Sequence, residues 1–252
     1  MKLLLVAPTA DSEAVGESWI AYQWVARLAE RHDVTVLSYH QRAKRPLAGQ
    51  LPNARVVEWR EPPLVGRNER FSAMLNPGYL PFLWRARRWI RAARARGEHF
   101  DLGHQVAPVS LRYPSPLAAT GIPYVVGPVG GSLDSPPAFV AEEGGAPWFT
   151  ALRRLDTFRL RHDPVLRRSF AQAACVLGIA DYVRDLLGDI PVREFRVLSD
   201  TGIEELPPAA PGSDRTAGVR FLFVGRVIRT KGVRDAVRAI GTLPPEVGVL
   251  DV

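Results

Sequence analysis

The stretch FLFVGRVIRTKGVRDAVRAIGTLPPEVGVLDV, residues 221–252, decides the fold class because it holds a complete strand–helix–strand pattern. Its apolar run 221–224 predicts a buried strand, and a loop carrying Arg226 and Lys231 follows. Apolar residues then recur at helical spacing, and the run 247–252 predicts the next parallel strand. About 30 residues of this kind make one βαβ unit.

The rest of the chain alternates in the same way. Seven more apolar runs have the length of buried strands: 3–6, 34–39, 55–59, 100–106, 123–129, 175–180 and 195–199. This alternation predicts the α/β class, with a Rossmann-like, doubly wound parallel sheet covered on both faces. The segment TGIEELPPAAPGSDRTAG lacks periodicity and is rich in Pro, Gly and Ala, which is typical of a linker. We therefore expect a first domain over 1–200, a linker over 201–218 and the first βαβ unit of a second domain over 219–252.

The loop after the run 221–224 has the chemistry to bind a diphosphate. Arg226 can hold phosphate oxygens as a planar fork and Lys231 as a point charge, while the helix N-terminus adds N–H donors and a positive dipole. The alternative is an ordinary strand-to-helix turn whose two cations are solvated. A P-loop is excluded, because Thr230 precedes Lys231 where that motif requires glycine.

Three segments carry a family resemblance: VGRVIRTKGV (224–233), GIPYVVGPVGGS (121–132), and VGESWIAYQW (15–24) followed by HDVTVLSY. The first resembles the donor-phosphate motif that opens the C-terminal domain of GT-B glycosyltransferases, especially the retaining family called family 4. The second resembles the late strand and glycine-rich loop of that family's N-terminal domain, and the third its first loop, helix and second strand.

The resemblance implies transfer of a sugar from a nucleotide-sugar donor to an acceptor hydroxyl with retention. Arg226 and Lys231 would stabilise the leaving diphosphate, and His104 would position the donor sugar. Four more residues would line the acceptor side: Gly16, Glu17, Gly130 and Gly131. No cofactor and no metal are implied, since GT-B enzymes generally offset the diphosphate charge with basic residues and helix dipoles.

Three of these assignments have structural alternatives. His104 lies near the carboxyl end of the run 100–106, where α/β sheets bind ligands, but a lone histidine is also often a hydrogen-bonded structural residue. The glycines of 127–131 also suit a tight turn. The family's paired-glutamate motif would lie beyond residue 252, so we expect a truncated donor domain and an inactive chain. The alternative is a non-catalytic remnant that binds a ligand or partner.

The segment WRARRWIRAARAR, residues 84–96, carries six arginines and no acid. As a helix it would present Leu83, Trp84 and Ile90 as an apolar stripe and dock on an anionic membrane, near carbohydrate or lipid-linked acceptors. The alternative is a helix packed on the sheet with a solvated arginine face. Specific nucleic-acid binding is not expected, because the sequence has no zinc module, recognition helix or stacking platform.

Composition narrows the class further. Hydrophobic residues make up 46% of the chain, enough for a packed core, and the formal net charge is +7. A single cysteine, Cys175, cannot form an internal disulfide and favours a reducing compartment. Residues 7–11 lack the Gly-x-Gly-x-x-Gly fingerprint of NAD-binding proteins. We therefore expect a cytoplasmic protein that is peripheral on the inner face of the cell membrane.

Overall fold

The computed structural model describes residues 1–40, 44–62, 78–131, 153–202, 219–225, 227, 231–244 and 247–252. These residues fall into two compact units, of which the first ends at Gly202 and the second contains the residues from Val219 onward. The first unit holds a seven-stranded sheet, and the second holds a two-stranded sheet.

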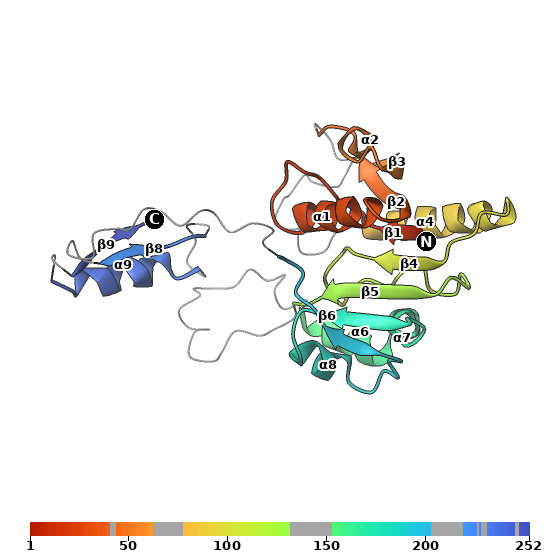
Figure 1. The fold of residues 1–252 in the computed structure, drawn as a ribbon. Coiled ribbons are helices and arrows are strands. Elements are labelled where there is room, and N and C mark those ends of the chain that lie inside the picture. The colour runs from red at the N-terminus through yellow and green to blue at the C-terminus, as the bar shows by residue number, and fades with distance from the viewer. Residues whose placement is uncertain are drawn as a thin grey trace. The chain divides into compact units, whose positions relative to one another are not determined.

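The strands of the first unit are all parallel and lie in the order β3-β2-β1-β4-β5-β6-β7 (Figure 1). They are β1 Lys2–Val6, β2 Asp33–His40, β3 Ala54–Arg60, β4 Leu102–Gln105, β5 Tyr124–Val129, β6 Cys175–Gly178 and β7 Phe195–Val197. Each strand falls on one of the seven predicted runs. The expected α/β class with a Rossmann-like parallel sheet is confirmed.

The helices of this unit are α1 Glu17–Ala29, α2 Leu47–Gln50, α4 Tyr79–Ala95, α6 Arg153–His162, α7 Pro164–Ala171 and α8 Tyr182–Leu187. Local sequence explains where several of them begin. Gly16 precedes α1 with φ of +68°, a backbone region that favours glycine. The Asp163 carboxylate caps α7 by accepting the N–H groups of Val165 and Leu166, and Pro164 fills the first helical position.

The core has two layers, one on each face of the sheet. Along β1, Leu3 and Leu5 pack into the cluster that contains α1 residues, while Leu4 and Val6 pack into the cluster that contains α4 residues. Alternate residues of a strand point to opposite faces, so β1 must be apolar throughout. This explains why the sequence shows a continuous apolar run rather than alternation.

Helix α4 corrects one expectation about the basic segment. Leu83 and Ile90 are buried in the core, whereas Trp84 is 62% exposed and shares the outer face with Leu80, which is 69% exposed. Leu83 and Ile90 are seven residues apart and so lie on one face, while Trp84 is turned about 100° from Leu83. The three residues therefore do not form one stripe.

The second unit consists of β8 Val219–Leu222, α9 Val233–Gly241 and β9 Gly248–Asp251 (Figure 1). β8 and β9 pair in parallel from Val219↔Gly248 to Leu222↔Asp251, so the predicted βαβ unit is present. β8 begins two residues before the apolar run, because Val219 and Arg220 pair with β9. Within the described part of the chain, no helix is both long and apolar enough to cross a membrane.

Candidate functional site

The arrangement of strands points to one edge of the first unit's sheet. The chain leaves β1 toward β2 and β3 on one side, then returns to β4 on the other side of β1. In open α/β sheets, ligands bind beyond the carboxyl ends of the strands where the order reverses in this way. β1 and β4 end side by side there, with Val6 paired to Gln105 and Leu5 to His104.

His104 is held firmly at this point. Its ring is 7% exposed, and Nε2 lies 2.6 Å from the carbonyl oxygen of Gly127 at β5. A carbonyl oxygen only accepts hydrogen bonds, so Nε2 must carry the hydrogen and Nδ1 is left as an acceptor. The bond therefore selects the tautomer as well as the orientation of the ring.

The surroundings keep His104 neutral. Burial lowers the pKa of His104 from 6.5 to about 4, and the Gly127 carbonyl only partly opposes this. The Trp24 ring of α1 contacts His104 edge-on, with the ring centroids 5.3 Å apart. Trp24 Nε1 also donates to the carbonyl oxygen of Asp200 at 3.3 Å, so α1, β4 and the segment after β7 meet at this pair of rings.

Glu17, in the first turn of α1, bridges the two sides of the reversal point. Its Oε1 accepts the backbone N–H of Val109 at 3.0 Å, which joins the loop after β1 to the loop after β4. Burial raises the pKa of Glu17, and the hydrogen bond from Val109 acts in the opposite direction. Gly16 beside it is exposed, and a side chain there would meet no atom within 4 Å. The backbone at Gly16 is thus open to a ligand.

The two predicted glycines after β5 differ from each other. Gly130 is buried and donates its N–H to the carbonyl oxygen of Val109 at 2.8 Å, and a Cβ there would lie 2.3 Å from Ile179. Gly131 is exposed, with φ of +87°, and its N–H donates to the Tyr182 hydroxyl at 2.9 Å. The missing side chain at Gly130 leaves room for Ile179 after β6, while its backbone N–H joins the loop after β5 to the loop after β4.

Val109 therefore links three of the segments expected in the site. Its N–H binds Glu17 and its carbonyl oxygen binds Gly130, so the first loop and the glycine loop are fixed to the same residue. Sequence reasoning did not identify Val109, and no signal pointed to it, because only main-chain atoms are involved. Glu17 and Gly130 are therefore both bonded to Val109, whereas Gly131 is exposed to solvent.

A second residue that sequence reasoning missed is Asp11. It is buried in the loop after β1, where its Oδ1 accepts the N–H of Glu13 and its Oδ2 lies 3.1 Å from Lys44 Nζ. Burial works to raise the pKa of Asp11, but Glu13, Lys44 and Gln50 together outweigh it and bring the pKa below its ordinary value. The ionised carboxylate stabilises the loop that leads to Gly16.

The predicted donor residues belong to the second unit. Lys231 is exposed and lies at the start of α9, next to Gly232, whose φ of +75° again favours glycine. Arg226 lies outside the described residues. Among the residues that are described, no group of three or more His, Cys, Asp or Glu could hold a metal ion.

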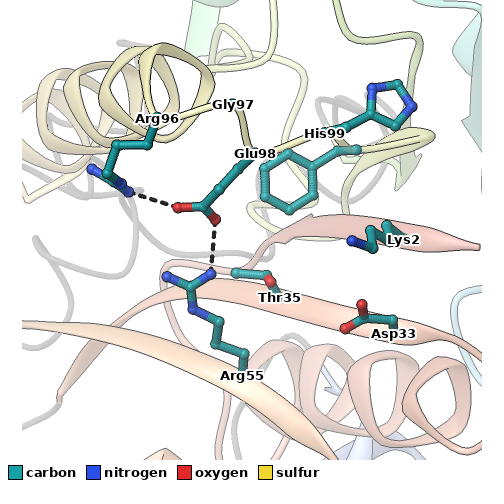
Figure 2. Close-up of a pocket in the computed structure, with 9 residues that line it drawn as sticks. Lys2, Asp33, Thr35, Arg55, Arg96, Gly97, Glu98 and His99 are labelled. Atoms are coloured by element: carbon teal, nitrogen blue, oxygen red, sulfur yellow. Dashed lines mark hydrogen bonds and ion pairs between the residues drawn. The ribbon is translucent and has the colours of Figure 1, made fainter.

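A hollow of about 520 Å³ at the opposite edge of the sheet, at the amino ends of β1, β2 and β3, is a poor candidate by comparison. Figure 2 shows Glu98 between Arg55 and Arg96, each bonded to it at 2.8 Å. The two arginines of this hollow are therefore already paired with a carboxylate. The hollow also lies at the amino ends of the strands, whereas ligands bind at the carboxyl ends.

Comparisons with known proteins give a family match and similar folds. The family described as glycosyl transferase 4-like domain matches residues 16–199. A search of curated proteins finds no match to the sequence. Among solved structures, sucrose-phosphate synthase from Thermosynechococcus elongatus is similar with a TM-score of 0.55 and 16% identity, over 99% of this chain and 61% of that one.

Two further solved structures have lower TM-scores. Arabidopsis thaliana UGT89C1 complexed with UDP-L-rhamnose has a TM-score of 0.49 and 12% identity, over 100% of this chain and 65% of that one. UDP-glucose: anthocyanidin 3-O-glucosyltransferase in complex with UDP has a TM-score of 0.46 and 12% identity, over 90% and 60%. The chain thus spans less than two thirds of the length of these proteins.

The family match contains every candidate residue of the first unit: Gly16, Glu17, His104, Gly130 and Gly131. It also covers six of the seven strands, from β2 to β7. The likeness to sucrose-phosphate synthase supports the same GT-B fold. Because the match extends over most of its residues, the chain belongs to the glycosyl transferase 4-like domain family.

Proposed function

We propose that this protein takes part in the transfer of a sugar from a nucleotide-sugar donor to a carbohydrate or lipid-linked acceptor hydroxyl, with retention of configuration. The observation that supports this best is the meeting of Glu17, Val109 and Gly130 at the reversal point, inside the family match. The nucleotide-sugar is a substrate, so no further cofactor is required.

In this proposal His104 positions the donor sugar and does not transfer protons. With a pKa of about 4 it is neutral at pH 7. Its Nε2 hydrogen is donated to Gly127, so a sugar hydroxyl that contacts Nδ1 must act as the donor. Gly16, Glu17, Gly130 and Gly131 form the acceptor side, where the exposed backbone of Gly16 and Gly131 is accessible.

Arg226 and Lys231 stabilise the negative charge that develops on the leaving diphosphate. Lys231 lies next to Gly232, the N-cap of α9, so its ammonium group and the positive end of the helix dipole act on the same ligand. Electrostatic stabilisation of this kind is often the largest single contribution to catalysis. The present chain carries one βαβ unit of the donor domain, and we propose that this unit alone does not bind the donor.

The test uses the 252-residue chain and a chain that carries a whole donor domain. Release of nucleoside diphosphate is measured over a panel of nucleotide-sugars. We expect activity only in the longer chain, and a loss of roughly tenfold to thousandfold with Lys231→Ala or Arg226→Ala. Arg238→Ala is the matched control, since Arg238 is an exposed cation in the last turn of α9, away from the helix N-terminus. An equal loss in the control, or robust transfer by the short chain, would contradict the donor site.

If the longer chain has no activity toward any nucleotide-sugar, the alternative is favoured, namely a non-catalytic remnant that binds a ligand or partner.

The His104→Ala variant gives a separate test of the first unit. His104 is buried and bonded to Gly127, so the variant should lose roughly 1–3 kcal/mol of stability in either case. If His104 positions the sugar, the turnover of the folded variant falls as well. Normal specific activity of the folded variant would leave His104 with a structural role alone.

We also propose that the protein acts at the cytoplasmic face of an anionic membrane, through the outer face of α4. Leu80 and Trp84 are exposed there, and the exposed cations Arg88 and Arg91 follow within two turns. Arg88 lies over the Trp84 ring, 5.6 Å from its centroid. An apolar patch beside arginines is the combination that binds lipid headgroups and the adjoining acyl chains.

Co-sedimentation with vesicles tests this surface. Binding should rise with phosphatidylglycerol content and fall with added salt, and Trp84→Ala should weaken it roughly tenfold. Phe158→Ala removes another exposed aromatic, on α6, and should leave binding unchanged. Binding that is indifferent to lipid charge would overturn the membrane proposal without affecting the proposed chemistry.

A further inference from the structure

A second hollow, on the face of the sheet covered by α4 and α7, collects positive charge, and no acid lies among its described lining residues. Its volume is about 250 Å³, and three arginines line it: Arg87 and Arg91 from α4 and Arg168 from α7. The loop before β5 supplies Thr120, and Val165 closes the side toward α7. None of the described residues that line the hollow carries a carboxylate.

The three guanidinium groups act unfavourably on one another. Burial lowers the pKa of Arg87, and the nearby charges of Arg91 and Arg168 add to this. Arg87 and Arg91 are four residues apart on one helix, a spacing at which like charges destabilise a helix. The buried Nε of Arg87 has no hydrogen-bond partner among the described residues, although its Nη2 donates to the Ser115 carbonyl at 3.3 Å.

Two other groups of arginines in the first unit are paired with carboxylates. At the amino edge of the sheet, Arg55 and Arg96 both bind Glu98 (Figure 2). Asp163, next to the hollow in sequence, is already bound by Arg159 at 2.7 Å and by two N–H groups of α7. The arginine hollow therefore differs from its neighbours in lacking a counter-charge within the described residues.

We propose that Arg87, Arg91 and Arg168 form a binding site for a phosphate group, separate from the site of sugar transfer. Guanidinium groups bind phosphate oxygens through paired N–H donors, and three of them can surround one tetrahedral anion. The hollow is smaller than the ~300–1,000 Å³ usual for a whole cofactor or drug-sized ligand. It therefore suits a phosphomonoester or phosphodiester with a small attached group, as in glycerol phosphate or a lipid headgroup.

The site lies away from the reversal point. The segment 118–120 precedes β5, so it belongs to the amino edge of that strand, whereas His104 and Gly130 lie at the carboxyl edge. A ligand here would not meet the acceptor or the donor. The phosphate site is therefore independent of the proposed sugar transfer, although it shares Arg91 with the outer face of α4.

Titration calorimetry with inorganic phosphate and with glycerol 3-phosphate tests the site, in a low-salt buffer free of phosphate. We expect saturable binding to the 252-residue chain and a loss of about tenfold or more per arginine in Arg91→Gln/Arg168→Gln. Both side chains are exposed, so this variant should fold, which circular dichroism can check. The matched control is Arg31→Gln/Arg161→Gln, which removes two exposed cations that lie outside the hollow and outside α4, and it should retain the affinity.

A second experiment, binding to lipid vesicles, shows whether the phosphate belongs to a lipid or to a soluble ester. If the ligand is a lipid headgroup, phosphatidic acid vesicles bind the wild type and the control much more tightly than the Arg91→Gln/Arg168→Gln variant, even where soluble glycerol 3-phosphate binds weakly. If the ligand is a soluble phosphate ester, only the calorimetric arm separates the two variants. Equal behaviour of the two double variants in both arms, or no binding of any probe to the wild type, would overturn the site.

Discussion

The two units of this protein are built from the same sequence pattern, yet they differ in how much of it they bury. In the first unit, β1 has four of its five residues buried. In the second, all four residues of β8 are exposed and α9 has no buried residue. Leu222 is 73% exposed and Val249 is 59% exposed, although both are as apolar as the residues of β1.

The difference teaches that an apolar run specifies a strand but not its burial. β1 has strands on both sides and core clusters on both faces, whereas β8 has β9 as its only strand neighbour among the described residues. Because hydrophobic stabilisation scales with the area removed from water, the first unit gains far more of it per residue. The two units should therefore respond very differently to the same kinds of perturbation.

Hydrogen exchange should show the largest contrast. The amides of β1, β4 and β5 should exchange only through global unfolding, while those of β8 and β9 open locally. We expect the two groups to differ in protection by roughly a thousandfold or more. Mass spectrometry of peptides from 1–200 and from 219–252 measures this directly. Similar protection in β1 and β8 would contradict the conclusion that the first unit is much more stable than the second.

Packing at glycines should give the next largest effect. Gly127 has φ of +119°, and a Cβ there would lie 2.2 Å from the backbone oxygen of Leu177. Gly127→Ala should destabilise the first unit by about 3 kcal/mol or more, as measured by urea unfolding. Gly241→Ala in α9 and Gly49→Ala in α2 add a methyl where no atom lies within 4 Å. Those two variants should leave stability unchanged or slightly raised.

A pH series sharpens the comparison at a single side chain. The pKa of His104 is about 4 in the folded chain and 6.5 when unperturbed, so the unfolded chain binds the proton first as the pH falls. The stabilisation from neutral His104 is present above pH 6.5 and is lost toward pH 4, with a total of roughly 3 kcal/mol. His104→Gln should remove this part of the pH dependence. His99→Gln, at an exposed position, should not.

The smallest effect is expected at Glu17. Burial raises its pKa, so its contribution to stability is greatest below the unfolded pKa and declines as the pH rises through the folded pKa. Glu17→Gln keeps an acceptor for the Val109 N–H but removes the charge. The variant should be more stable than wild type by less than about 1 kcal/mol at pH 7, and equal to it near pH 4. A large loss of stability at pH 7 would show that the charge itself is needed.

Much of the fold could be predicted from the sequence, because a parallel sheet covered on both faces requires continuous apolar runs. All seven strands of the first unit and the βαβ unit of the second lie on such runs. The sequence also predicted which edge of the sheet carries the candidate site, because His104 lies near the carboxyl end of the apolar run 100–106. These features depend on local composition, which a single sequence displays.

The contacts of the site could not be predicted in the same way. The bond from Val109 to Glu17 joins residues 92 positions apart, and Arg168 meets Arg87 and Arg91 from a different helix. Hydrophobic periodicity does not predict contacts between distant residues, since these contacts depend on strand order and on the path of each loop. The orientation of Trp84 was missed because a helix turns by about 100° at each residue.

The linkage at Val109 has a consequence for how relatives of this chain can vary. Both bonds use main-chain atoms, the N–H toward Glu17 and the carbonyl oxygen toward Gly130. Every amino acid except proline supplies both groups. The two hydrogen bonds therefore place no requirement on the side chain of residue 109 other than that it is not proline. Selection on this linkage would act on the partners, Glu17 and Gly130.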